Sequence, residues 1–406
     1  KALDDELNRY LASGYGIEPS KKDAYAKWLT SHRPCHWFVE FYGIMNGGGF
    51  DVIIGNPPYV EYSKVRRVYQ VRNFATESCG NLYAMCAERS VKLLGKSCRF
   101  GFIVQAPIVS TQRMAAVRGF MTDKSDILLY STYDDRPSKL FDGMHHCRLA
   151  IVLLRTHDGR SSSRVFTTRY LKWYLEERQN LFPVVSYFEL PGDSGADLVP
   201  KFRCEIERSA FQKLSRLKQS IGHLVSASDT DHRIYYKITG VGHWFTFTTK
   251  PPKFWRDGVD GSSTRENSVS FRSALLRDTV FCCLWSTLHY WIYQARTNCR
   301  DFNPSDLQYL PFPEAVAKGL PELQKLARRI DKCLEENSEV GTATYSIGGA
   351  VQYERFRPKL AKPIIDDVDR VLGQHYGFTE EELDFIINYD IKYRMGRDAD
   401  DEGSNE

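Results

Sequence analysis

The sequence predicts an α/β fold in which a doubly wound sheet is followed by a smaller α+β domain and a C-terminal helical segment. Three observations predict it. Apolar runs typical of strands alternate with helical patterns in the first half of the chain. Prolines and glycines then crowd together around residues 182–200, where we expect a domain boundary. In the last third, apolar residues recur at helical spacing.

The sheet is expected to be built from short strands separated by helices. Strands are predicted at residues 36–41, 50–54, 100–105, 127–133 and 149–154. Helices are predicted at residues 2–11, 22–29, 81–94 and 113–121. Asn81 can cap the third of these helices. The glycines at 47–49 precede a strand rather than a helix, so they indicate a plain turn and not a phosphate-binding loop.

The strand at 50–54 is the most informative one. Val52, Ile53 and Ile54 form a short β-branched run, which is typical of a strand covered on both faces. Gly55 then permits a sharp bend or a close approach of the backbone. In an open α/β sheet, ligands bind where such strands end. We therefore expect a binding site directly after residue 55.

The strand runs into the rigid turn Asn56-Pro57-Pro58-Tyr59. The two prolines fix their φ angles and remove two backbone donors, so the side-chain oxygen of Asn56 and the carbonyl of Pro57 can point at a ligand. Tyr59 follows, and its flat aromatic ring can stack on a ligand. Taken alone, the tetrapeptide would more often be only a strand-ending turn. The preceding Phe-Asp-Val-Ile-Ile-Gly reverses that preference.

The stretch at 50–59 resembles the catalytic loop of amino-methyltransferases that use S-adenosylmethionine, and its two acceptors and its ring suit the chemistry that this resemblance implies. An amino group on an aromatic ring is a poor nucleophile because its lone pair is delocalised. Hydrogen bonds from its two hydrogens to Asn56 and Pro57 would favour a tetrahedral nitrogen and aim the lone pair at a methyl donor. A base within duplex DNA must first be flipped out, and Tyr59 would stack on it. No metal or covalent intermediate is needed.

Basic residues indicate a polyanionic partner. Lys64, Arg66 and Arg67 follow the turn, in a segment that is equally well explained as a solvated loop. Residues 201–300 hold 16 lysine and arginine against 8 acidic residues, whereas 301–406 hold 13 against 22. Aromatic residues alternate with Lys250, Lys253 and Arg256, which suits a nucleic-acid interface. The alternative is a small β-rich domain with an aromatic core.

The rest of the chain is predicted mainly helical. A long apolar helix, or a strand and a helix, is expected at 275–293. Amphipathic helices are expected at 321–337, 364–376 and 380–389, and Thr379 and Glu382 form a capping-box pattern before the last. Residues 338–349 are rich in Gly, Thr and Ser and should be loose, and the acidic residues 398–406 should be disordered.

Composition excludes several classes of protein. The chain has 406 residues and 42% hydrophobic residues, enough for two or three domains with real cores. No apolar run reaches the length of a membrane span. The ten cysteines include no Cys-x-x-Cys pair, so we expect free thiols in a reducing cytoplasm and no metal site.

Several stretches together resemble one family, the gamma-class DNA adenine-N6 methyltransferases of restriction–modification, type IIG or phage-defence type. The resemblance is carried by residues 49–60, 81–104, 139–155, 183–313 and 364–394. It implies a partial Rossmann-like methyltransferase sheet in a catalytic domain at 1–182. It also implies a target-recognition domain at 183–313, a helical segment at 314–397 and an acidic tail at 398–406.

The resemblance also implies the site and its partners. Asn56, Pro57 and Tyr59 would be catalytic, and Phe141 would stack on the other face of a flipped adenine. The cofactor would be S-adenosylmethionine, with Pro58 beside it, and the partner would be double-stranded DNA. Without the family, Phe141 would be a core residue.

One departure is serious, because the family binds its cofactor with a Gly-rich loop that follows a strand upstream of the turn. Residues 1–50 contain no such loop after a strand, and His36 stands where many relatives carry an acidic residue. We expect an upstream region or a partner chain to supply it. Two other hypotheses remain: a protein-glutamine or RNA methyltransferase, which can share the Asn-Pro-Pro-Tyr turn, or a DNA-recognition module without catalysis.

Overall fold

The computed structural model describes residues 2–144, 146–159, 162–192, 198–239, 242–345 and 349–396. The chain forms two compact units, residues 1–201 and 202–406. The finer division into a catalytic domain, a target-recognition domain and a helical segment stays a prediction. The predicted acidic tail at 398–406 lies outside the described residues. Within the described residues, none of the helices combines the length and the apolar character needed to span a bilayer.

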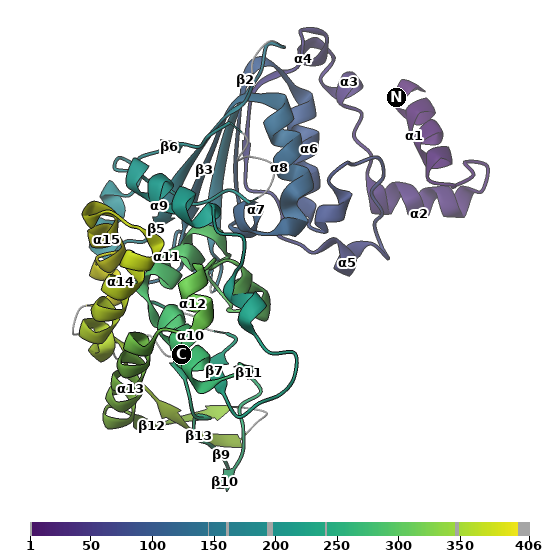
Figure 1. Cartoon of the computed structure of the whole chain (residues 1–406). Helices are drawn as coiled ribbons and strands as arrows, with labels where there is room; N and C mark the ends of the chain where they lie inside the picture. The colour runs from purple at the N-terminus through teal and green to yellow at the C-terminus, as the bar shows by residue number, and fades with distance from the viewer. Residues whose placement is uncertain are drawn as a thin grey trace. The chain divides into compact units, whose positions relative to one another are not determined.

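The first unit is built on a six-stranded mixed sheet with the order β1-β2-β4-β3-β5-β6 (Figure 1). Its strands are β1 (Phe50–Gly55), β2 (Leu94–Gln105), β3 (Ser125–Tyr133), β4 (Leu149–Thr156), β5 (Arg164–Leu171) and β6 (Phe188–Glu189). β1 runs parallel to β2 and β3 runs parallel to β5, whereas β4 is antiparallel to both of its neighbours. The predicted α/β class is therefore confirmed as a mixed α/β fold.

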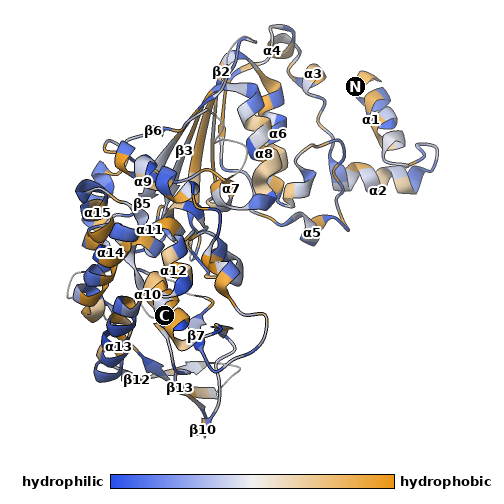
Figure 2. Cartoon of the chain, viewed as in Figure 1, coloured by the Kyte–Doolittle hydropathy of each residue, from blue (hydrophilic) through white to orange (hydrophobic). Residues whose placement is uncertain are grey.

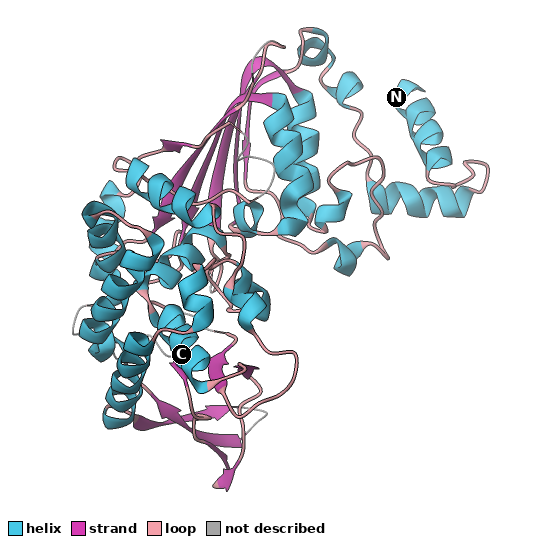
Figure 3. Ribbon diagram, viewed as in Figure 1, coloured by secondary structure: helices cyan, strands magenta, loops and turns pink. Residues whose placement is uncertain are grey.

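Helices accompany the sheet in the first unit (Figure 3). They are α1 (Ala2–Gly14), α2 (Lys22–His32), α3 (Trp37–Glu40), α4 (Tyr42–Asn46), α5 (Tyr62–Val65), α6 (Leu82–Leu93), α7 (Pro107–Ser110) and α8 (Ala115–Lys124). α6 packs on β2 and α8 packs on β3. The strands around β3 are strongly apolar (Figure 2), and Phe100, Phe102 and Leu128 are buried. The predicted cap of α6 is present, because the Asn81 side chain accepts a hydrogen bond from the Tyr83 amide.

β1 differs from its prediction in burial. It is a strand as expected, but it lies at an edge of the sheet and, among the described strands, pairs only with β2. Val52 is 56% exposed and Ile54 is 78% exposed, so the expectation of a strand covered on both faces is wrong for the described residues. Ile54 pairs with Gly101, which pairs in turn with Leu153, itself 41% exposed. We call the exposed side chains of Val52, Ile54 and Leu153 the open apolar face.

Residues 36–41 were expected to form a strand, and this prediction is wrong. Residues Trp37–Glu40 form the short helix α3. Trp37 and Phe41 lie one helical turn apart and stack with ring centroids 5.4 Å from each other. Both rings meet Phe50 at the start of β1, at 6.0 and 5.4 Å. Trp37 and Phe41 are four residues apart, so in a helix both rings lie on one face, which here packs against the strand.

The second unit combines two small antiparallel sheets with a group of helices (Figure 1). One sheet has the order β10-β9-β13-β12 and the other β11-β7-β8. The strands are β7 (Arg233–Lys237), β8 (Phe247–Thr248), β9 (Phe254–Arg256), β10 (Val259–Asp260), β11 (Glu266–Ser270), β12 (Glu339–Tyr345) and β13 (Gly349–Arg355). The helices are α9 (Glu205–Ser215), α10 (Ala274–Trp285), α11 (Thr287–Arg296), α12 (Glu314–Lys318), α13 (Pro321–Glu336), α14 (Lys362–Tyr376), α15 (Glu380–Ile387) and α16 (Ile391–Arg394).

Several predictions for this unit are confirmed and one is wrong. α13, α14 and α15 lie where helices were predicted, and Thr379 and Glu382 exchange both hydrogen bonds of the capping box. The predicted long helix at 275–293 is divided at Ser286, which caps α11. Residues 338–349, expected to be loose, contain β12, which pairs with β13 from Glu339 to Tyr345.

Candidate active site at the carboxyl edge of the sheet

The topology brings two predicted site segments to one edge of the sheet. β1 and β2 are parallel, so the turn at 56–59 leaves the sheet on the side where β2 ends. Gln105 at the end of β2 and Tyr133 at the end of β3 both pair with Leu149, the first residue of β4. The segment 134–144 therefore leaves the sheet at the same edge as the turn.

The turn is fixed at both of its ends. Gly55 pairs with Phe102 in the last step of the β1–β2 ladder. Beyond the turn, the Val60 carbonyl accepts a hydrogen bond from the Leu82 amide at 2.9 Å. Glu61 then accepts two hydrogen bonds from Arg113, at 3.0 and 2.8 Å, and these lower the pKa of its carboxyl group. The backbone of the turn is thus held between β2 and the start of α6.

Asn56 and Pro57 present the two acceptors that the sequence predicts. Asn56 is exposed and Pro57 is half-buried. Among the described residues, none donates a hydrogen bond to the Asn56 side chain or to the Pro57 carbonyl. Pro58, the predicted cofactor contact, is exposed. The roles of these three residues stay predictions, but their acceptors are available to a ligand.

Tyr59 is held more firmly than a loop residue usually is. Its hydroxyl donates to the Ile103 carbonyl at 3.0 Å, one residue beyond the last β1–β2 pair. Its ring meets that of Tyr83 edge to face, with centroids 6.4 Å apart. Burial, and then the neighbouring Cys147, raise the pKa of Tyr59 to about 12, so the hydroxyl remains a donor at physiological pH.

The segment with Phe141 rests on the core that supports Tyr59. This core, which we call the edge cluster, consists of Tyr133, Leu140, Leu149, Trp173 and Leu181. Tyr59 packs against it, and so does Met144. Phe141 directly follows the buried Leu140 and is itself 36% exposed. The edge cluster therefore supports the Tyr59 ring and Leu140, the residue directly before Phe141.

A buried group of charges lies where the same segment begins. Arg148 Nε contacts Asp134 Oδ1 at 3.1 Å and Asp135 Oδ1 at 3.3 Å. Lys172 Nζ lies 4.0 Å from Asp134 Oδ2. Burial opposes ionisation, but Arg148 and Lys172 still hold the pKa of Asp134 below its usual value, whereas burial raises the pKa of Asp135. Sequence reasoning missed this group, although two acidic residues directly after a strand were a signal.

The basic residues after the turn fall into two groups. Lys64, Arg66 and Arg67 are exposed, and none forms an ion pair with another described residue. Arg66 and Arg67 line a cleft of about 510 Å³. Arg72 also lines it but is engaged, because it donates to the Gly14 carbonyl and lies over the Tyr15 ring. The first three remain available to bind an anion.

The candidates in the second unit lie on or beside one small sheet. Arg256 is the last residue of β9, and Lys253 directly precedes this strand. Both side chains are exposed. Lys250 pairs with Glu335, so one of the three predicted cations is already neutralised. The alternative of an aromatic core holds for Tyr236 and Phe245, which are buried, whereas Phe254 and Trp255 on β9 are half-buried.

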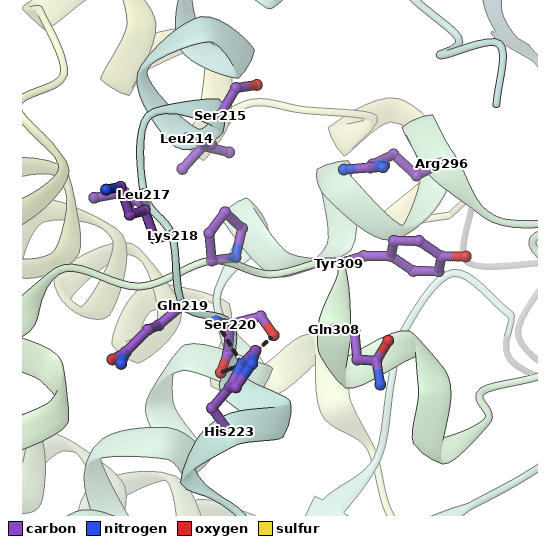
Figure 4. Close-up of a pocket in the computed structure, with 11 residues that line it drawn as sticks. Leu214, Ser215, Leu217, Lys218, Gln219, Ser220, His223, Arg296, Gln308 and Tyr309 are labelled. Carbon is purple, nitrogen blue, oxygen red and sulfur yellow. Dashed lines mark hydrogen bonds between the residues drawn. The ribbon is translucent and has the colours of Figure 1, made fainter. Parts of the chain in front are cut away.

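A second pocket, of about 490 Å³, was not anticipated from the sequence (Figure 4). Lys218 and Arg296 line it, and no carboxylate does. The Arg296 guanidinium lies 5.0 Å from the centroid of the Tyr309 ring, which also lines the pocket. His223 contacts Ser220 on the opposite side, as the dashed lines in Figure 4 mark. The pocket is suited to an anion.

Comparison with known proteins identifies the segment that carries the turn. Residues 8–141 match the Eco57I restriction-modification methylase family. The match to the Eco57I methylases includes the turn at 56–59 and ends at Phe141. The predicted restriction–modification methyltransferase family is thereby confirmed.

The relatives that this chain matches are considerably longer. A putative type II restriction enzyme and methyltransferase of Methanocaldococcus jannaschii is 26% identical over 271 residues, which are 61% of this chain and 22% of that relative. The chain thus spans about a fifth of its curated relative. Distant likeness extends to a nuclease-deletion mutant of the Type ISP restriction-modification enzyme LlaGI in complex with a DNA substrate mimic. The TM-score is 0.41 and the identity 9%, over 82% of this chain and 40% of that one. For the type IIG restriction endonuclease BpuSI the TM-score is 0.31 and the identity 10%, over 83% and 54% of the two chains.

Proposed function

We propose that this chain carries the methyl-acceptor side of a site-specific DNA adenine-N6 methyltransferase of a restriction–modification or phage-defence system. One observation carries the proposal. The Asn-Pro-Pro-Tyr turn stands at the carboxyl edge of the sheet, fixed at both ends, with the acceptors of Asn56 and Pro57 available. The family match over residues 8–141 supports it. We also infer that the mixed sheet is part of a Rossmann-like methyltransferase fold.

In this proposal the turn orients the amino group of a flipped-out adenine. The side-chain oxygen of Asn56 and the carbonyl of Pro57 each accept one amino hydrogen. The nitrogen lone pair then points away from the plane of the base, toward the methyl donor. Because the turn is anchored at Gly55 and Val60, little reorganisation is needed when the base arrives.

Two rings hold the base after it leaves the duplex. Tyr59 stacks on one face and Phe141 on the other, and the edge cluster supports Tyr59 and Leu140, the residue before Phe141. Base–aromatic stacking is worth roughly 1–3 kcal/mol for each ring, comparable with the few kcal/mol needed to unpair and unstack a base. Stacking from both sides therefore offsets much of the cost of flipping.

Double-stranded DNA is the proposed partner. Lys64, Arg66 and Arg67 would contact phosphates close to the flipped base, because they follow the turn and lack ion-pair partners among the described residues. The residues 183–313 would read the target sequence, with Lys253 and Arg256 better placed than the paired Lys250.

The described residues fit the acceptor but not the cofactor. S-adenosylmethionine supplies the methyl group in this chemistry. Gly14-Tyr15-Gly16 lies at the end of helix α1, and the glycines at 47–49 precede a strand, so neither forms a strand–loop–helix cradle for an adenosyl group. We assign only Pro58 to the cofactor's side, and we propose that an upstream region or a partner chain supplies the cofactor loop.

The alternative functions differ in the molecule that would receive the methyl group. A protein-glutamine or RNA methyltransferase would use the same two acceptors on another amino or amide nitrogen. A recognition module would bind DNA and transfer nothing. Transfer of a labelled methyl group from S-adenosylmethionine should therefore be measured on duplex DNA, RNA and protein, with this chain and with the longer protein that contains it.

Asn56→Ala is the decisive variant. We expect it to lower methyl transfer to DNA by at least about a hundredfold, the usual effect of losing one such polar group at a reacting centre. DNA affinity should change by less than about tenfold, because Asn56 contacts only the reacting base. Asn180→Ala is the matched control, since Asn180 is also exposed and lies outside the turn. Label on RNA or protein alone would overturn the proposal, as would unchanged transfer by Asn56→Ala.

A further inference from the structure

The segment 134–144 has no regular secondary structure, yet it must place Phe141 with precision. A backbone outside helices and sheets obtains its hydrogen bonds from elsewhere. Leu140 is 4% exposed within the edge cluster, while Phe141, the next residue, is 36% exposed. The direction of the Phe141 side chain therefore depends on how the peptide between these two residues is held.

Arg178 holds the backbone at this point. It lies on the 3-10 helix η3 (Leu175–Asn180), after β5. Its Nη1 donates to the Lys139 carbonyl at 3.1 Å and its Nη2 to the Leu140 carbonyl at 2.6 Å. Two parallel donors on a planar guanidinium fix orientation as well as distance. The Leu140 carbonyl belongs to the peptide that leads into Phe141, so the clamp acts one bond from the predicted stacking residue.

A second set of contacts fixes the beginning of the segment. The Asp134 amide donates to the Leu171 carbonyl at 2.9 Å, and the buried Asp134 side chain pairs with the half-buried Arg148. The segment is thus tied at its first residue and again directly before Phe141. Between these two points, the segment contributes Leu140 to the edge cluster.

We propose that Arg178 is a positioning residue for base capture, which holds Phe141 where it can stack on the flipped adenine. The inference rests on the proposed function and adds a residue to it. Arg178 does not touch the base. It acts through two carbonyls, and its loss leaves Phe141 on a segment with freedom to turn away. A misplacement of about 1 Å at a reacting site can lower the rate on the order of a hundredfold.

The test uses the form of the protein that transfers methyl groups. Arg178→Met removes both donor nitrogens and keeps most of the side-chain volume. Arg178→Lys keeps the positive charge but has a single donor nitrogen. The control is Arg164→Met, since Arg164 forms an equally bidentate pair with Glu189 on β5 and β6, away from this segment. Methylation is measured on DNA with a paired target adenine and on DNA whose target adenine faces an abasic site.

We expect Arg178→Met to lower kcat about tenfold on the paired target and less than threefold on the unpaired one, because an unpaired base is already partly free to leave the stack. Arg178→Lys should lie between wild type and Arg178→Met, and Arg164→Met should equal wild type. In the background of Phe141→Ala, Arg178→Met should add little, since both changes remove the same contact.

An equal loss on both DNAs would overturn the inference, because it would mean that Arg178 only maintains the fold. Full additivity with Phe141→Ala would overturn it as well. If Arg178→Met does not fold, Arg178→Lys carries the same comparison of the two DNAs. Wild-type protein that methylates neither DNA would refute the proposed function itself, whereas a wild-type-like Arg178→Met would refute only the role of Arg178.

Discussion

Tyr59 allows the contributions of a ring and of a hydroxyl to be separated. Tyr59→Phe keeps the ring and removes the hydrogen bond to the Ile103 carbonyl. Such a bond contributes about 1 kcal/mol to stability, within a range of about 0.5–1.5. Tyr59→Ala also removes the ring and with it the proposed stacking on the base, which would contribute roughly 1–3 kcal/mol. The two variants should therefore differ in activity far more than in stability.

The expected magnitudes follow from these energies. The ring's contribution corresponds to about a 5- to 150-fold loss in kcat/KM for Tyr59→Ala, since about 1.4 kcal/mol is a factor of ten. Tyr59→Phe should lose no more than about tenfold, because its ring still rests on the edge cluster and near Tyr83. Methyl transfer to duplex DNA measures both, and 2-aminopurine at the target position reports base flipping directly.

The pH profile gives an independent check. The pKa of Tyr59 is raised to about 12, so its hydroxyl stays protonated and bonded well above physiological pH. Activity should show no limb from Tyr59 between pH 7 and about 10. If Tyr59→Phe falls as far as Tyr59→Ala, the hydroxyl and not the ring is the essential part. If Tyr59→Ala leaves both transfer and the 2-aminopurine signal unchanged, stacking by Tyr59 is wrong.

Two further predictions concern the second unit. Burial lowers the pKa of His289 to about 4, so the folded state favours the neutral ring, and its stabilising contribution, complete above pH 6.5, is lost as pH falls toward 4. Between pH 7.5 and 5 the wild type should lose about 2 kcal/mol more unfolding free energy than His289→Phe, measured with urea. An equal loss in the two proteins would mean that folding does not lower the pKa of His289. In the pocket lined by Lys218 and Arg296, Lys218→Ala should reduce the salt dependence of DNA binding by about one ion. The control Lys318→Ala, which breaks an exposed pair with Glu314, should not reduce it. If the two variants show the same salt dependence, Lys218 does not contact a phosphate in this pocket.

The features that could be predicted from the sequence are those with a local cause. The strand and turn at 50–59 follow from adjacent β-branched residues, a glycine and two prolines. The capping box of α15 depends on Thr379 and Glu382, three residues apart. In each case the stabilising partners are close in the chain, so the pattern contains the whole physical reason.

The features that were missed depend on partners far away in the chain. Arg178 meets the carbonyls of Lys139 and Leu140 across nearly forty positions, and no spacing rule indicates such a contact. α3 was taken for a strand because six residues cannot distinguish the two periods, and its packing on Phe50 decides the matter. β12 was missed because Gly341, Thr342 and Thr344 obscured the alternation that its pairing with β13 reveals.

The open apolar face is different, because there the sequence pattern and the exposure disagree. Val52 and Ile54 have the composition of a strand covered on both faces, yet both are exposed, and β1 has a free edge. An exposed apolar patch beside an unpaired strand edge usually marks an interaction surface. We infer that the upstream region or partner chain proposed to supply the cofactor loop also covers this face.

Val52→Lys tests this inference, with Val259→Lys on the exposed edge strand β10 as the matched control, since Val259 is 69% exposed. In the 406-residue chain alone both variants should change the unfolding free energy by only about 0.5 kcal/mol, because exposed positions tolerate substitution. In the form that transfers methyl groups, Val52→Lys should lower both the melting temperature and the activity, since a lysine charge would be buried against the covering segment without a partner. Val259→Lys should lower neither. If Val52→Lys melts like wild type in the active form, this face stays exposed to solvent during catalysis. The segment proposed to supply the cofactor loop would then contact β1 only along the edge of the strand.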